Sequence, residues 1–155
     1  MKLTRVLATA GLAAGLISTM AFADGHNLPA EVKARNGLMA NYSLYLGILG
    51  DMAKGEREYN EDLALTAAKN LAAFAATDQS LLWPEGTDTM SIDGTRALPK
   101  IWEDRADFDA KADDLDKAAS AMAQVTDIDL EAIQVSMKDL GGACSACHKP
   151  YREPE

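Results

Sequence analysis

The sequence predicts an all-α protein folded as an antiparallel four-helix bundle. Alanine is abundant, runs of β-branched residues are absent, and no stretch shows the alternation of apolar and polar residues that is typical of a half-buried strand. Apolar residues instead recur at spacings of three, four and seven, which is the pattern of the inward faces of packed helices. The 155 residues contain no internal repeat and no sign of a second folded domain.

The chain opens with a basic and apolar segment. Lys2 and Arg5 precede an apolar stretch, which closes at Ala23 with AFA, an A-x-A cleavage site. This pattern predicts a secretory signal peptide over residues 1–23, because the apolar run is shorter than the roughly 20 residues that a spanning helix needs. We expect residues 24–155 to form one small exported domain, periplasmic if the source is a Gram-negative bacterium.

The first two helices are predicted from their end signals. In NLPAEVKARNG, Asn27 is a candidate N-cap and Pro29 suits the first turn of a helix that runs to about Lys54. Gly55 is a good stop signal. The second helix begins after Asn60, with acidic residues in its first turn, as the helix dipole favours.

A long connection separates the second helix from the third. The stretch WPEGTDTMSIDGTRALPKIWED holds two prolines and two glycines, so we expect no regular element in it. Its length exceeds that of usual connections, which suggests a functional or packed loop anchored by Trp83 and Trp102. The third helix is predicted over about Arg105–Val125 and the fourth over about Leu130–Tyr151.

The inward stripes of the first and last helices can be read from their spacing. On the first helix the stripe comprises Val32, Met39, Tyr42, Leu46, Leu49 and Ala53. On the fourth it comprises Ile133, Met137, Leu140, Cys144, Cys147 and Tyr151. Arg35 interrupts the first stripe, so it needs a charge partner or must extend its long side chain to water.

The sequence GGACSACHKPYREPE contains the only two cysteines, Cys144 and Cys147, and His148 follows directly. C-x-x-C-H is the attachment spacing for c-type haem, in which both thiols bind the haem vinyl groups and the imidazole becomes an axial ligand. A thioredoxin-like pair would follow a strand, and structural zinc would need a fourth ligand. A chance pair or simple disulfide is the remaining alternative. Haem attachment agrees with export, because it takes place on the exported side.

The charge balance excludes some partners. The net charge is −9, and removal of Lys2 and Arg5 with the signal peptide makes it −11. An acidic surface argues against binding to nucleic acid or to anionic membrane. The same charge would favour a redox partner with basic patches.

Several stretches resemble class II c-type cytochromes, the cytochrome c-prime family: VKARNGLM, LGDMAKGEREY, LWPEGTD, TRALPKIWEDRADFDAKADDL and GGACSACHKPYR. The position of C-x-x-C-H near the C-terminus, with Tyr and Arg just beyond, is typical of this class. The resemblance implies a four-helix bundle with one covalent haem c in its core, held by Cys144 and Cys147 with His148 as proximal ligand. It also implies that Arg35 and Arg152 lie near the haem edge or propionates, and that homodimers form through the first two helices.

The family divides at the distal side of the haem. Members with Leu or Phe four residues after the first-helix Arg are five-coordinate and high-spin, and some bind NO or CO. A low-spin branch, which includes proteins like cytochrome c-556, has Met there, and Met39 stands at this spacing. We therefore predict an electron carrier with His148 and Met39 on the iron, and keep a gas-binding or NO-buffering protein as the alternative. No paired carboxylates or second histidine are placed for acid–base catalysis, so an enzyme is not expected.

Overall fold

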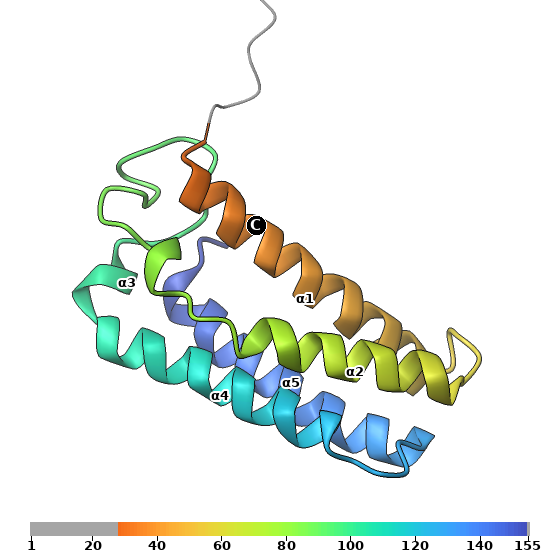
Figure 1. Cartoon of the computed structure of the whole chain (residues 1–155). Helices are drawn as coiled ribbons and strands as arrows, with labels where there is room; N and C mark the ends of the chain where they lie inside the picture. The colour runs from red at the N-terminus through yellow and green to blue at the C-terminus, as the bar shows by residue number, and fades with distance from the viewer. Residues whose placement is uncertain (1–27, 155) are drawn as a thin grey trace, which may run out of the picture.

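The computed structural model describes residues 28–154, and over this range four long helices form an antiparallel bundle (Figure 1). They are α1 (Ala30–Lys54), α2 (Glu61–Ala75), α4 (Arg105–Ala123) and α5 (Leu130–Tyr151). Both α1 and α4 pack against α2 and α5, so α1 and α4 lie diagonally across the bundle. The predicted fold class is confirmed, whereas the predicted signal peptide lies outside the described residues.

The helix ends follow the local signals closely. Gly55 ends α1 in the left-handed conformation, with φ of 77°, and the Asn60 side chain accepts a hydrogen bond of 2.8 Å from the Leu63 N–H at the start of α2. Pro29 is the N-cap of α1 rather than part of its first turn, and its carbonyl accepts the Lys33 N–H at 3.0 Å. Asn27, predicted as the N-cap, lies outside the described residues.

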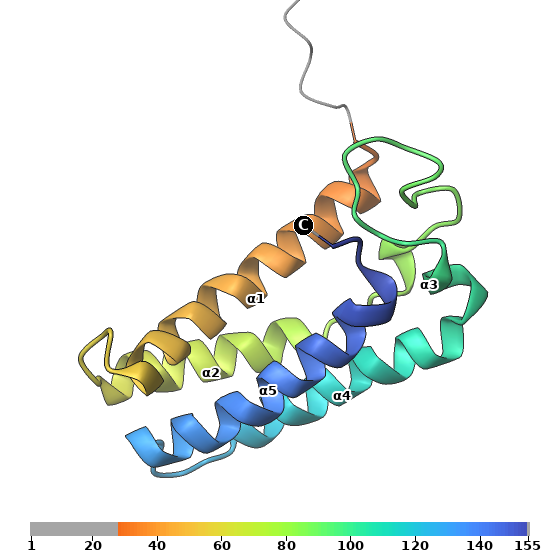
Figure 2. The same ribbon diagram turned by 180° about the vertical axis from the view of Figure 1, so that it is seen from behind.

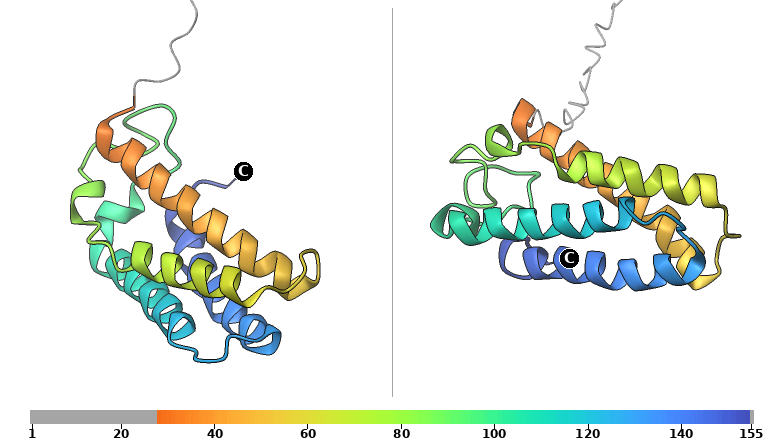
Figure 3. Two further views of the ribbon diagram at one scale, coloured as in Figure 1. Left: turned by 45° about the vertical axis from the view of Figure 1, so that its right-hand side comes forward. Right: turned by 60° about the horizontal axis from the view of Figure 1, so that its bottom comes forward.

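The long connection is more regular than predicted. A 3-10 turn, η1 (Ser80–Leu82), precedes it, and one turn of helix, α3 (Lys100–Glu103), lies near its end. The Trp102 indole donates a hydrogen bond of 3.1 Å to the Trp83 carbonyl, and the Trp83 ring packs edge-on against Phe108 of α4, so Trp83 anchors the connection to the bundle as predicted. Figure 3 shows this connection at the end of the bundle where α1 begins and α5 finishes.

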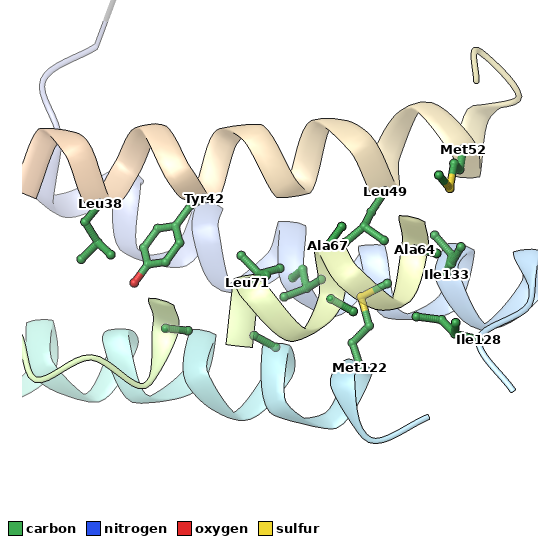
Figure 4. Close-up of a cluster of buried hydrophobic side chains, with 14 residues drawn as sticks. Leu38, Tyr42, Leu49, Met52, Ala64, Ala67, Leu71, Met122, Ile128 and Ile133 are labelled. Carbon is green, nitrogen blue, oxygen red and sulfur yellow. The ribbon is translucent and has the colours of Figure 1, made fainter. Parts of the chain in front are cut away.

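Two clusters of buried side chains form the core. The larger one lies between the four helices, and its members drawn in Figure 4 include Leu49, Leu71 and Ile133. The smaller one packs the long connection against α4 and the end of α5; it consists of Trp83, Ala97, Ile101, Phe108 and Tyr151. The second cluster therefore fixes the loop beside the C-x-x-C-H motif.

Half of the residues in the predicted stripes are buried, and those at the height of the motif are among the ones that are not. Val32, Tyr42 and Leu49 are buried as expected, whereas Met39 is 36% exposed. Cys144 and Cys147 are only half-buried. The reason is visible in Figure 2, where α1 and α5 lie close together at the start of α5 and separate toward its end.

Candidate functional site

The last two turns of α5 carry the C-x-x-C-H motif. Since an α-helix has 3.6 residues per turn, the spacings of three and four place Cys144, Cys147 and His148 on one side of the helix. Cys147 packs against the aromatic cluster. Beside the motif lies a surface hollow of about 400 Å³, lined by Cys144, Ser145, His148, Lys149, Arg152, Glu153 and Pro154. Cys147 is thus packed against the core, whereas Cys144 and His148 border a hollow that a ligand could enter.

The two thiols are free and are not activated as nucleophiles. Burial raises the pKa of Cys144, and burial, opposed by the charge of Lys111, raises the pKa of Cys147 to about 11. A thioredoxin-type pair instead needs a lowered thiol pKa, commonly at a helix N-terminus, and this motif lies at the other end of α5. Within residues 28–154 no group of three or more His, Cys, Asp or Glu side chains is placed to hold a metal ion.

His148 is held as a neutral imidazole near neutral pH. Burial lowers its pKa, and the charges of Arg152 and Arg96 lower it further. Arg96 belongs to the long connection, and its guanidinium donates hydrogen bonds of 3.1 and 2.5 Å to the Glu153 carbonyl. Nothing in the sequence pointed to Arg96, because it lies 52 residues before His148 and is brought close by the bridge between Ala97 and Arg152.

Arg35 is buried at the same end of the bundle, only 2% exposed. Its guanidinium donates to the Thr87 hydroxyl at 2.8 Å, the Thr87 carbonyl at 2.6 Å and the Thr95 hydroxyl at 2.8 Å, and it lies 4.7 Å from the Trp83 ring centroid. Burial lowers its pKa, and the negative charge of Asp88 opposes the shift. The alternative that Arg35 extends to water is therefore wrong. Its contact with a haem propionate stays a prediction.

The register of α1 against α5 positions Met39. Gly50 lies eleven residues after Met39, about three turns, and so shares its face of α1. A Cβ on the buried Gly50 would lie 3.4 Å from Met137 Cε on α5. Because the two helices are antiparallel, eleven residues back along α1 correspond to eleven forward along α5. Met39 is thus at about the height of His148.

The partial exposure of Met39 agrees with the separation of α1 from α5. Met39 shares the face of α1 on which Gly50 approaches α5, yet it is 36% exposed, and α1 and α5 separate toward the end of α5. Two other methionines lie elsewhere: Met52 is buried in the main core at 1% exposure, and Met90 is 83% exposed in the long connection. Two free thiols and an imidazole are the groups that attachment of a c-type haem requires, and a thioether is one of the side chains that can supply a second axial ligand. Fold and donor set together define a bundle-type c haem protein.

Comparison with known proteins agrees with this class. The sequence profile described as "Cytochrome C'" matches residues 30–152, and the chain belongs to this family. Its cofactor is covalently bound haem c, and the two cysteines fit the C-x-x-C-H attachment. The protein is accordingly an electron carrier or a gas binder of the cytochrome c' family.

Relatives and solved structures cover nearly the whole domain. Cytochrome c-554 of Cereibacter sphaeroides is 37% identical over 132 residues, covering 85% of this chain and 99% of the relative. Cytochrome c-556 of Agrobacterium tumefaciens (strain B2A) is 33% identical over 122 residues, covering 79% and 96%. The structure described as cytochrome c' from Rhodobacter Spheriodes has a TM-score of 0.77 at 30% identity, covering 81% and 96%. A cytochrome c' described as showing ligand-controlled dimer dissociation has a TM-score of 0.72 at 26% identity, covering 80% and 95%.

Proposed function

We propose that this protein is an exported one-electron carrier whose haem is attached to Cys144 and Cys147, with His148 and Met39 as axial ligands. The observation that supports the proposal is the register of α1 against α5, from which the partly exposed Met39 lies at about the same height along the bundle as His148. When bound, the haem supplies one-electron exchange between ferric and ferrous iron.

The side chains around the motif would each serve that exchange. The two thiols would anchor the group, and the lowered pKa of His148 keeps its imidazole free to act as a ligand. The Met39 sulfur would stabilise ferrous over ferric iron and would leave no open site for a gas. Arg152 lines the hollow beside His148 and would lie at the haem edge or propionates. We assign the same neighbourhood to Arg35, four residues before Met39.

Two further points support the proposal. Cytochromes c-554 and c-556 are among the relatives, and the c-556 branch is the one for which the resemblance implies a Met ligand. The predicted signal peptide, cleaved after Ala23, would deliver the chain to the periplasm, where haem is attached. Within residues 28–154, every helix is too short or too polar to cross a bilayer.

A five-coordinate protein that binds or buffers NO or CO is the second candidate. The observation that favours it is the 36% exposure of Met39, since a thioether that is not enclosed by neighbours can turn away and leave room for a diatomic ligand. The family itself contains both kinds of protein, so only the iron coordination distinguishes them.

Absorption spectra of the wild type and of Met39→Leu, each reduced, with and without CO, test the proposal. The substitution nearly conserves volume, so packing should change by less than about 1.5 kcal/mol. We expect the wild type to be low-spin with a spectrum that CO does not change, and the variant to be high-spin and to bind CO. A high-spin, CO-reactive wild type would favour the gas-binding candidate.

We also expect a homodimer through α1 and α2, as the resemblance implies. Leu44 on α1 is 55% exposed, and the neighbouring structure with ligand-controlled dissociation is a dimer by its description. Leu44→Glu should shift the sedimentation coefficient from dimer to monomer, because burying a charge in an apolar interface is costly. A wild-type protein that sediments as a monomer at all concentrations would contradict this expectation.

A further inference from the structure

We infer that the face formed by α1 and α5 beside the C-x-x-C-H motif is the docking surface for a redox protein that is acidic around its own cofactor. The inference rests on the proposed electron-carrier function and specifies its partner. It differs from what the net charge of −9 alone suggests, which is a partner with basic patches.

The charges on this face are few and mainly positive. Residues 36–50 of α1 and 140–147 of α5 contain no charged side chain, although a quarter of the whole chain is charged. At the end of α5 the exposed Lys149 and Arg152 line the hollow together with Glu153.

An acidic surface lies between α2 and α4. Helix α4 lies diagonal to α1 and packs against α2 and α5. Of its five aspartates, Asp107 faces α5, where it accepts a hydrogen bond of 2.7 Å from the Tyr151 hydroxyl; the others are Asp109, Asp113, Asp114 and Asp116. A second hollow, between the end of α2 and α4, is lined by four carboxylates, those of Asp78, Asp109, Asp113 and Asp116, with Arg105 as its cation. Helices α2 and α4 together carry seven acidic and four basic side chains, whereas α1 and α5 carry four acidic and five basic ones, so α2 and α4 are the more negative pair.

Local charge decides which surface a partner meets. A bundle two helices thick is about 20 Å across, whereas charges are screened over about 10 Å at 0.1 M ionic strength. A partner at the α1–α5 face consequently senses Lys149 and Arg152 more than the carboxylates that line the α2–α4 hollow. Lys149 follows His148 and points about 100° around α5 from it, so it stays available even if Arg35 and Arg152 engage the haem propionates.

The test compares Lys149→Glu with Lys69→Glu, an equal change of charge at an exposed position of α2. The reduced holoprotein is oxidised by ferricyanide, an anion, and by tris(phenanthroline)cobalt(III), a cation. At 0.1 M ionic strength and a separation on the order of 10 Å, Lys149→Glu should slow the ferricyanide reaction about fivefold and speed the cobalt reaction. Lys69→Glu should change either rate by less than about 1.5-fold, because its distance exceeds the screening length.

A second readout does not depend on the rate. Carbodiimide couples lysine amines to carboxylates that lie in contact, so cross-linking to an acidic flavodoxin should yield a peptide that contains Lys149. Equal rate effects of the two substitutions, or cross-links confined to Lys111 and Lys117 on α4, would overturn the inference while leaving the carrier function intact. A protein that exchanges electrons with neither reagent would overturn both.

Discussion

The buried Arg35 provides a quantitative test of how the long connection is held against the bundle. Its guanidinium is 2% exposed, and in place of a carboxylate it contacts neutral acceptors of the connection. We consider Thr87→Val, which keeps the shape of the side chain but removes a buried hydroxyl. That hydroxyl accepts from Arg35 Nη1 at 2.8 Å and donates to the Pro84 carbonyl at 2.8 Å.

The magnitude follows from these contacts. A hydrogen bond to a charged group contributes about 1.5–3 kcal/mol to stability, and a neutral one about 1 kcal/mol. After the substitution, Arg35 Nη1 keeps only the Leu82 carbonyl, at 3.4 Å, so a buried cation is poorly solvated. We expect the free energy of unfolding to fall by about 2–3 kcal/mol. At about 3 °C per kcal/mol for a domain of this size, Tm should fall by about 6–9 °C.

Urea and thermal unfolding of the holoprotein, followed by circular dichroism, measure this loss. Thr77→Val is the matched control, because Thr77 is exposed just beyond the end of α2 and its hydroxyl donates to the Ala73 carbonyl at 3.3 Å. The control should change stability by no more than about 0.5 kcal/mol. If Thr87→Val costs no more than Thr77→Val, the buried cation does not depend on the connection and the reasoning fails.

The motif and its neighbours give further expectations. Replacing Cys144 and Cys147 together by Ala should leave no covalent haem, and acid–acetone should fail to strip haem from the wild type; stripping would refute thioether attachment. His148→Ala should alter both ferric and ferrous spectra, and unchanged spectra would mean that another residue binds the iron. The Tyr151 hydroxyl donates to Asp107 at 2.7 Å, and this bond lowers the pKa of Asp107. The stability advantage of the wild type over Tyr151→Phe should therefore be complete above about pH 4 and decline as pH falls below it, as acid titration of the two proteins would show. A difference that is independent of pH would contradict the role of the bond.

Local signals in the sequence determined the helices and the chemistry of the motif. Gly55 and Asn60 are recognisable because a helix end is decided by a few neighbouring residues. The spacing of Cys144, Cys147 and His148 is equally local, since one stretch of helix carries all three side chains. The single turn α3 was not predicted, because the prolines and glycines of the connection indicate an irregular loop.

The tertiary structure alone decided what surrounds the motif. Arg35 finds Thr87 and Thr95 at separations of 52 and 60 residues, and Arg96 comes near His148 through a bridge at the end of α5. Spacing carries no information about such contacts, because a long connection can place its side chains against many parts of a bundle. The exposure of Met39 is also nonlocal, since its position in the heptad predicts burial and only the separation of α1 from α5 uncovers it. The net charge of the sequence likewise does not say where on the surface the charges lie. The fold places α4, with its aspartates, diagonal to α1 and leaves Lys149 and Arg152 beside the motif.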